Sequence, residues 1–227
     1  MKLSVIMPTL DEEEALAAAL AHVRAGARPR LVELVVADGG SKDGTLAAAR
    51  ASADLALALE RPGRAYQMHC GALAATGDIL LFLHADTRLP EGWLDMLLAA
   101  WRSRPRPGST AFQLGFDHPA AFYRVIERIA AWRSRLTGVP FGDQGIAVAR
   151  EAYLASGGFP DVPIMEEYYL LRKLRRIGPI RILPGRVRTS VRRYERGGRV
   201  RRSLRNVLIT GLFHLGMRPR ALARLYR

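Results

Sequence analysis

The sequence predicts an α/β fold, in which helices flank a mostly parallel sheet and a basic helical region follows. Short apolar runs alternate with helical patterns through the first half of the chain, which is typical of parallel sheets. The length of 227 residues, with 49% hydrophobic and 25% charged residues, suits a buried core and excludes wholesale disorder. Basic residues are concentrated near the C-terminal end.

The apolar runs and helical spacings locate the individual elements. Strands are expected at residues 3–7, 31–37, 54–59, 78–83 and 110–116, with one or two more within 180–191. Helices are expected at residues 12–23, 64–75, 91–102, 120–136 and 166–177, with a further one ending near residue 50. Pro8 is expected to end the first strand, and the acids after it suit the first turn of a helix.

Cysteine content and hydropathy indicate the compartment. Cys70 is the single cysteine, so an internal disulfide framework is excluded and a reducing environment is favoured. No window reaches the roughly 18 uninterrupted apolar residues of a membrane-spanning helix. The N-terminus enters a strand pattern without a signal-peptide layout. We therefore expect a cytoplasmic protein, with peripheral attachment to the inner face of a membrane left open.

The charge distribution divides the chain into two unequal parts. Residues 172–227 contain 18 basic residues and one acid, Glu195, whereas residues 1–171 contain 17 basic and 20 acidic residues. This asymmetry indicates an anionic partner, such as an acidic membrane surface or a phosphorylated substrate. Nucleic acid is disfavoured because few aromatic residues interrupt the basic stretch.

The basic region contains one amphipathic pattern. Apolar residues fall at helical offsets and form one stripe: Leu204, Val207, Leu208, Gly211, Leu212 and Leu215. Two interpretations stay open. The helix either packs its stripe on the domain beneath a solvated basic face, or lays it in an anionic lipid interface.

Three polar clusters follow expected strands, at residues 9–12, 38–40 and 84–86. Ligands of open parallel sheets bind beyond the carboxyl ends of the strands, so these clusters are candidates for a nucleotide site. Asp38 would accept hydrogen bonds from a base or ribose, and Asp86 would hold a divalent metal against phosphates. The simpler alternative is that each carboxylate caps the helix that follows it.

Other nucleotide and catalytic sites are disfavoured by the motifs. The sequence contains no GxxxxGK[ST] phosphate loop, no GxGxxG turn after the first strand and no GxSxG nucleophile elbow. One cysteine and five scattered histidines do not provide the spacing of a zinc site. These absences argue against P-loop enzymes, dinucleotide-binding domains, serine hydrolases and zinc proteins.

An ordered set of motifs spanning about 165 residues resembles the family 2 glycosyltransferases of the GT-A fold. The motifs are VIMPTLDEE at 5–13, VVADGGSKDGT at 35–45, residues 63–71, ATGD at 75–78, LFLHADTRLP at 81–90, FGDQG at 141–145, GGFP at 157–160 and MEE at 165–167. The HAD and FGDQ forms are similar to a bacterial subgroup of small stand-alone enzymes. The resemblance implies a Rossmann-type mixed sheet, mostly parallel.

The resemblance also implies roles for individual residues. Pro8, Thr9 and Glu12 would line the nucleotide base and ribose, and Asp38 would contact the base. Arg64 would approach the diphosphate, and Asp86 would bind the metal, as the last residue of a DxD-like motif. His84 stands where the family places the first acid of that motif, so it is at most an auxiliary ligand.

The acceptor side is implied in the same way. Glu166 and Glu167 match the acidic pair that supplies the general base, although Glu167 stands where the family usually has aspartate. Asp143 and Gln144 would lie near the donor sugar and the acceptor. The segment 192–194 partly resembles an arginine–aromatic motif that closes over the phosphates. The expected catalytic domain is 1–198, divided into a nucleotide-sugar half at 1–104 and an acceptor half at 105–198, followed by one basic amphipathic helix at 199–227.

The resulting prediction is an inverting sugar transferase that depends on Mg²⁺ or Mn²⁺. It would move a sugar from a nucleotide-diphosphate donor to an acceptor hydroxyl, with Glu167 or Glu166 as the general base. The acceptor would be either lipid-linked or free. Two alternatives stay open. One is a non-catalytic protein that binds a nucleotide sugar or a lipid, and the other is a nucleotidyltransferase.

Overall fold

The computed structural model describes residues 1–226, except for the side chains at positions 136, 193, 196, 197 and 226. The strands are β1 (Leu3–Thr9), β2 (Val32–Asp38), β3 (Leu55–Ala58), β4 (Ile79–Phe82), β5 (Thr87–Arg88), β6 (Ser109–Gln113), β7 (Ile146–Ala149), β8 (Ile180–Arg186) and β9 (Arg188–Thr189). The helices are α1 (Glu13–Ala25), α2 (Thr45–Ser52), α3 (Arg64–Ala74), α4 (Trp93–Arg102), α5 (Ala121–Thr137), the 3₁₀ turn η1 (Gly142–Gln144), α6 (Arg150–Ala155), α7 (Glu166–Leu174), α8 (Arg192–Gly197), α9 (Arg199–His214) and α10 (Pro219–Tyr226).

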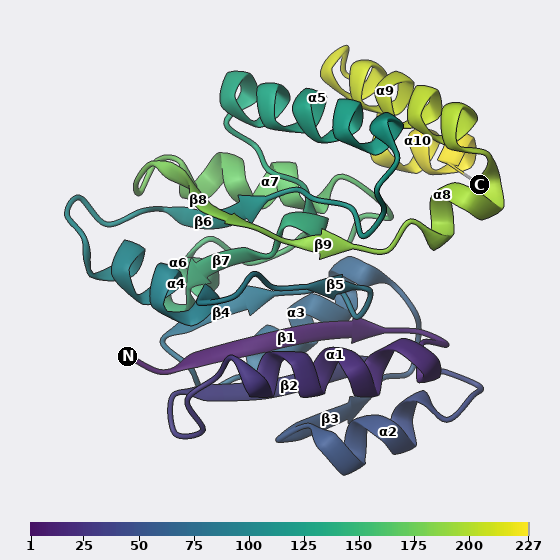
Figure 1. The fold of residues 1–227 in the computed structure, drawn as a ribbon. Helices are drawn as coiled ribbons and strands as arrows, with labels where there is room; N and C mark the ends of the chain where they lie inside the picture. Colours follow the sequence, from purple (N-terminus) through teal and green to yellow (C-terminus); the bar gives the residue numbers. More distant parts are fainter. Residues whose placement is uncertain (227) are drawn as a thin grey trace.

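Seven strands form one mixed sheet in the order β3-β2-β1-β4-β7-β6-β8 (Figure 1). β1 pairs in parallel with β2 and β4, and β2 pairs in parallel with β3. β7 is antiparallel to both β4 and β6, while β8 is parallel to β6. The predicted mixed, mostly parallel sheet is therefore confirmed. The short strands β5 and β9 form a separate antiparallel pair.

Helices cover both faces of the sheet because successive residues of its strands point to opposite sides. Val5 and Met7 of β1 pack in one core cluster with residues of α1, α2 and α4. Ile6, between them, packs in a second cluster with residues of α3, α6 and α7. The near-continuous apolar sequence of the central strands reflects this burial on both faces.

Pro8 does not end β1, contrary to the sequence-based expectation. β1 continues to Thr9, and Pro8 lies opposite Ala37 in the pairing with β2. The pairing of β1 with β4 stops at Ile6, opposite Phe82. Pro8 thus lies where β1 is paired on one side only, and there a proline is tolerated.

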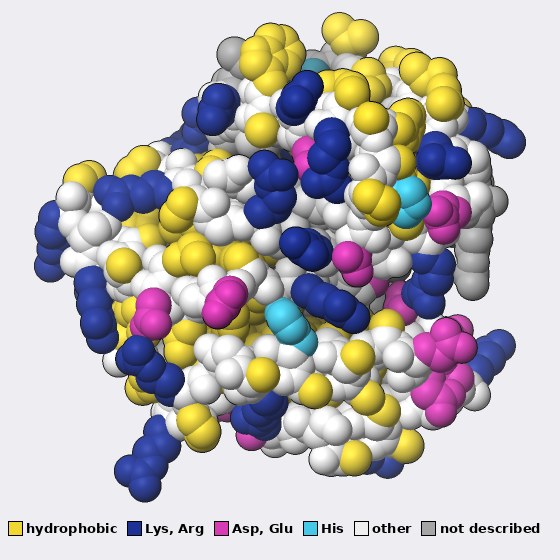
Figure 2. Space-filling view, viewed as in Figure 1, with side chains coloured by type: hydrophobic (Ala, Val, Ile, Leu, Met, Phe, Trp, Pro, Cys, Tyr) yellow, Lys and Arg dark blue, Asp and Glu magenta, His cyan; other side chains and the backbone are white. Residues whose placement is uncertain are grey.

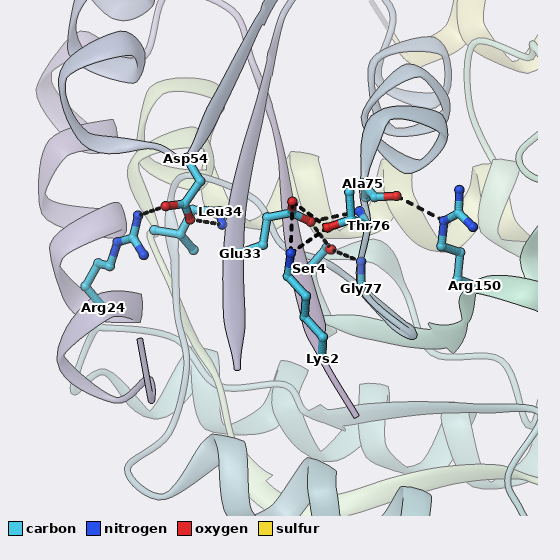
Figure 3. A network of polar contacts seen from close by, with 10 residues as sticks. All are labelled: Lys2, Ser4, Arg24, Glu33, Leu34, Asp54, Ala75, Thr76, Gly77 and Arg150. Atoms are coloured by element: carbon cyan, nitrogen blue, oxygen red, sulfur yellow. Dashed lines mark hydrogen bonds and ion pairs between the residues drawn. The ribbon is translucent and has the colours of Figure 1, made fainter. Parts of the chain in front are cut away.

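Polar contacts join the strands at the edge of the sheet where β1 and β2 begin (Figure 3). The Glu33 carboxylate accepts hydrogen bonds from the Ser4 hydroxyl and from the Thr76 backbone N–H, the latter at 2.9 Å. Asp54 accepts from the Leu34 N–H at 2.7 Å and is paired with Arg24. These contacts hold β1, β2 and the starts of β3 and β4 in register, which fixes where the opposite, carboxyl edge lies.

The C-terminal region forms two helices in place of the single one expected at 199–227. α9 and α10 are separated by Gly216, whose φ is +94°, and by Pro219, which begins α10. The apolar stripe of α9 does not pack on the domain: Leu204 is 65% exposed and Leu208 56%. The packing interpretation of this stripe is therefore wrong, because the side chain that α9 buries is Ile209, which lies outside the stripe.

Candidate functional site

A cavity of about 300 Å³ lies beyond the carboxyl end of β4. Its walls come from the segment after β4, from η1, from the start of α7 and from one face of α9. The charged and polar side chains lining it are Arg64, His84, Asp86, Asp143, Glu167, Thr189, Ser190, Tyr194, Arg202, Asn206 and Thr210. Four of the residues expected from the sequence are thus brought together here: Arg64, Asp86, Asp143 and Glu167.

Asp86 lies next to the β5–β9 pair. Its backbone carbonyl accepts a hydrogen bond from Ser190 N–H at 3.0 Å, which holds the segment after β9 beside it. The Thr87 hydroxyl donates to Asp86 Oδ1 at 3.4 Å. Because a strand, β5, follows Asp86, the alternative of Asp86 as a helix cap does not apply.

The acidic pair begins α7 and is held by Arg64. Met165 precedes it with φ +65°, a conformation that few non-glycine residues adopt, and so turns the chain sharply into the helix. Glu167 lines the cavity, whereas Glu166 lies behind it with 1% exposure. Arg64 forms ion pairs with both carboxylates, through Nε to Glu166 and through Nη2 to Glu167 at 3.2 Å.

The acids of the cavity have perturbed ionisation. Burial raises the pKa of Glu167 to about 7, with a further increase from the adjacent Glu166 that Arg64 opposes. Burial likewise raises the pKa of Asp143 to about 6, although Arg133 and Arg64 lower it and Asp86 raises it. A carboxylate that titrates near neutral pH is suited to accept a proton in a reaction.

Gly142 allows the acids to approach the loop around η1. A Cβ atom added at Gly142 would lie 2.3 Å from Glu167 Oε1 and 3.1 Å from His84 Nε2. Any side chain at this position would therefore displace Glu167 or the loop. The glycine of the FGDQG segment consequently lets the end of β4 and the start of α7 meet in one site.

Gln144 does not line the cavity, although the sequence analysis placed it near donor and acceptor. Its amide donates to the Phe112 carbonyl at 2.9 Å, and its Oε1 accepts from the Phe141 N–H at 3.0 Å. Gln144 is 2% exposed, so it fixes the loop that presents Asp143. Asp143 Oδ1 is buried without a hydrogen-bond partner among the residues that the structure describes.

The residues expected at the nucleotide lie at the carboxyl ends of β1 and β2, outside the cavity lining. Asp38 is 1% exposed, and its carboxylate accepts from the N–H groups of Gly40 at 3.1 Å and Ser41 at 3.0 Å. Thr9 also donates to it, at 3.2 Å. Asp38 therefore organises the turn after β2. The parallel pairing of β1 with β2 places Pro8, Thr9 and Asp38 side by side at one sheet edge.

Glu12 connects this edge to the basic region. Arg192 Nη2, at the start of α8, pairs with Glu12 Oε2 at 2.7 Å. Tyr194, two residues further along α8, lines the cavity. Arg193, the middle residue of the segment 192–194, has a side chain outside the described part. The ion pair thus holds the C-terminal helices over the carboxyl edge of the sheet.

α9 contributes to the site, which was not predicted from the sequence. Arg202, Asn206 and Thr210 line the cavity and are spaced four residues apart, on the face of the helix opposite the apolar stripe. Asn206 Nδ2 lies 3.5 Å from the Tyr194 hydroxyl. This polar spacing is visible in the sequence, on the face of the helix opposite the apolar stripe.

The donor set fits a metal only if a ligand supplies part of the coordination. No group of three His, Cys, Asp or Glu side chains is arranged to hold an ion within the described part of the chain. Asp86 and Asp143 nevertheless line one cavity and interact electrostatically. Mg²⁺ is commonly held by one or two carboxylates together with substrate phosphates, so these residues suit a cation that arrives with a diphosphate.

Solved structures support the fold. A mannosyltransferase from Pyrobaculum calidifontis, solved with GDP-Man and Mn²⁺, superposes with a TM-score of 0.65 and 27% identity over 84% of this chain and 57% of that one. TarS from Staphylococcus aureus (residues 1–349) gives 0.63 at 16% identity, covering 100% of this chain and 69% of that one. Glucosyl-3-phosphoglycerate synthase from Mycobacterium tuberculosis gives 0.59 at 22% identity, over 83% and 70%. The last two matches show the fold alone.

Sequence comparisons point to the same family. A Mycobacterium tuberculosis (strain H37Rv) protein described as an uncharacterized glycosyltransferase is 38% identical over 96 residues, and a Mycobacterium bovis protein of the same description matches equally well. The aligned segment spans 42% of this chain and 42% of each relative. The model of glycosyl transferase family 2 matches residues 4–155. The resemblance noted in the motifs is thereby confirmed, and the chain belongs to glycosyl transferase family 2.

Proposed function

We propose that this protein transfers a sugar from a nucleotide-diphosphate donor to an acceptor hydroxyl, with inversion at the anomeric carbon. The observation that carries the proposal is that Glu167, with a pKa of about 7, shares a cavity with Asp86 and Arg64. The cavity thus combines a proton acceptor with groups suited to a diphosphate. The mannosyltransferase solved with GDP-Man and Mn²⁺ supports a donor of this class.

Glu167 serves as the general base in this proposal. Its carboxylate accepts the proton of the acceptor hydroxyl as that oxygen attacks the anomeric carbon. The bond from the anomeric carbon to the donor phosphate breaks, and the nucleoside diphosphate leaves with the electron pair. Attack opposite the leaving group inverts the configuration. Glu166, which lies behind Glu167 and pairs with Arg64, positions Arg64 and raises the pKa of Glu167.

Arg64 and Asp86 help to neutralise the negative charge of the departing diphosphate. Arg64 is 40% exposed and pairs with both glutamates, so a donor phosphate that attracts its guanidinium would weaken the Arg64–Glu167 pair. A divalent cation, Mg²⁺ or Mn²⁺, would be held by Asp86 with Asp143 nearby and would neutralise charge on the diphosphate. His84, which lines the same wall, stays an auxiliary candidate.

The nucleoside would bind along the edge formed by Pro8, Thr9, Glu12 and Asp38. Asp38 is occupied by the Ser41 hydroxyl and by two backbone N–H groups, so contact with a base requires the Ser41 hydroxyl to turn away. Glu12 would reach a ribose hydroxyl only when Arg192 releases it. Arg192 would then be free to approach the phosphates.

A donor screen tests this function and separates it from the alternatives. Thermal shift with UDP-, GDP- and dTDP-sugars, each with and without Mn²⁺, identifies the donor, and product analysis follows. Release of a nucleoside diphosphate supports sugar transfer. Release of pyrophosphate from a sugar phosphate and a nucleoside triphosphate would instead indicate a nucleotidyltransferase. Tight donor binding without any turnover would indicate a non-catalytic binding protein.

A further inference from the structure

Two helices at one end of the molecule expose apolar side chains to solvent. α5 exposes Val125, Ile129 and Trp132, which are 50%, 52% and 66% exposed and fall on one helical face. α9 and the residue that follows it expose five more apolar side chains, at 56% to 86%: Val200, Leu204, Val207, Leu208 and Leu215. We call these eight side chains the α5–α9 apolar face. Hydrophobic side chains are visible over these helices in Figure 2, interspersed with basic ones.

The two helices turn their other faces toward the body of the protein. Tyr123 of α5 is buried, and its ring centroid lies 6.0 Å from that of Tyr194. Asn206 of α9 contacts the hydroxyl of the same Tyr194. α5 and α9 lie beyond β6 and β8, at the end of the molecule away from β2 and β3 (Figure 1). Their apolar stripes therefore point outward at the same end.

The exposed charged side chains on α5, α9 and α10 have one sign. The exposed basic residues of these helices and of α10 are Arg128, Arg135, Arg199, Arg201, Arg220 and Arg224. The described parts of the three helices contain one acid, Glu127, which is 5% exposed and paired with Arg124 and Arg186. A second copy of this chain would bring the same positive charge to the contact, whereas an anionic surface would neutralise it.

An apolar helix face with basic residues beside it and an exposed tryptophan is typical of docking at a lipid interface. None of the described helices is long and apolar enough to cross a bilayer. We propose that the α5–α9 apolar face docks on a bilayer containing anionic phospholipid, with Trp132 and the α9 leucines at headgroup depth. α5, which the sequence analysis did not connect with lipid, supplies the aromatic anchor.

Docking in this orientation brings the cavity to the membrane. α9 lies between the two, because Arg202, Asn206 and Thr210 line the cavity while Leu204 and Leu208 face outward. A helix with its side chains is about 10–12 Å across, so the lipid surface would lie about that far from the cavity wall. This consequence rests on the proposed transferase function: an acceptor hydroxyl carried on a lipid would lie on the same side of the protein as the cavity that Glu167 lines.

Trp132 provides a direct spectroscopic test. Trp93 and Trp101 are 1% and 3% exposed on α4, so the change in tryptophan emission on docking reports Trp132. Vesicles of phosphatidylglycerol and phosphatidylcholine are added to the full chain at low salt, without nucleotide or acceptor. We expect the emission to move to shorter wavelength and acrylamide quenching to fall. Phosphatidylcholine vesicles alone should give much weaker effects, and Trp132→Phe should abolish the shift.

Sedimentation with the same vesicles tests the leucines. The double variant Leu204→Ser/Leu208→Ser should bind roughly tenfold or more weakly, because two apolar side chains no longer enter the interface. Leu73→Ser, which alters a 54% exposed leucine on α3, should bind like the unaltered protein. Binding should also weaken as salt rises.

Three outcomes would overturn the proposal. The first is that the unaltered chain neither sediments nor shifts its emission with phosphatidylglycerol vesicles at low salt. The second is vesicle binding that the double variant leaves unchanged, since charge alone would then account for it. The third is an emission shift that depends on protein concentration without vesicles, which would assign the face to a second copy. Because no donor is present, these outcomes do not depend on whether sugar transfer occurs.

Discussion

Glu167 is a buried carboxylate whose charge depends on pH near neutrality. Burial raises its pKa from about 4.5 to about 7 in the free protein, so it is largely protonated below that pH. A protonated carboxyl group cannot accept the acceptor proton. We therefore expect kcat/KM to rise about tenfold per pH unit below pH 7 and to level off above it. Rates measured from pH 5 to 9 check this, and a flat profile between pH 5 and 8 would contradict the role of Glu167.

Asp86 is the residue expected to couple metal and nucleotide. Asp86→Asn should abolish the Mn²⁺-dependent increase in affinity for the nucleoside diphosphate, because the neutral amide is a much weaker ligand for a hard cation. Calorimetry with and without Mn²⁺ measures the effect. Asp95→Asn, on an exposed position of α4, is the matched control and should retain it. An undiminished metal effect in Asp86→Asn would remove Asp86 from the metal site.

At this scale, the sequence predicted part of the set of residues that meet in the cavity. Arg64, Asp86, Asp143 and Glu167 were anticipated and do share the cavity. The hydrogen bond from the Gln144 amide to the Phe112 carbonyl could not be anticipated, because it depends on where β6 lies in the folded protein. Side-chain partners that come from far along the chain are set by the tertiary fold.

The 3₁₀ turn η1 is the element that brings the acids of the site together. Gly142→Ala would place a Cβ atom 2.3 Å from Glu167 Oε1, so Glu167 or the turn has to move. We expect kcat to fall by about tenfold or more, since base catalysis requires hydrogen-bond reach, with the melting temperature little changed. Steady-state rates and thermal denaturation measure the two effects.

Gly211→Ala is the matched control for this prediction. A Cβ atom at Gly211 meets nothing within 4 Å, and alanine favours the helix, so activity in solution should be unchanged. An active Gly142→Ala variant with unchanged kcat would show that the close approach of Gly142 to Glu167 has no part in catalysis.

The prediction of strands succeeded where hydrophobicity alone determines the strand, and it failed where pairing with a neighbouring strand determines it. The runs that became β1, β2 and β4 are buried on both faces and are evident in the sequence. β7 (Ile146–Ala149), which is as short as β4, was not predicted, and its strand conformation follows from antiparallel pairing with β4. Pro8 was wrongly expected to end β1. A proline is tolerated inside this strand because the β1–β4 pairing stops before it.

The whole molecule joins a mildly acidic body to a basic C-terminal region that covers the site. The charge asymmetry was evident in the sequence. Its placement was not, because the orientation of α9 depends on the Arg192–Glu12 ion pair and on packing around Tyr194. As a result, α9 presents polar residues to the cavity and apolar residues to the outside, and one helix serves both the proposed site and the proposed lipid contact.

The turnover rates of Glu167→Gln and Glu166→Gln test most directly the central claim, that Glu167 is the general base. With the donor from the screen, Glu167→Gln should lower the rate of nucleoside-diphosphate release by roughly 10²–10⁴-fold, because an amide cannot accept the proton. Donor affinity, measured by calorimetry, should be nearly unchanged. Glu166→Gln should reduce the rate less, since Glu166 lies behind the cavity. A Glu167→Gln variant that turns over at the rate of the unaltered protein would contradict the account. A large loss of rate in Glu166→Gln with only a small loss in Glu167→Gln would identify Glu166 as the base.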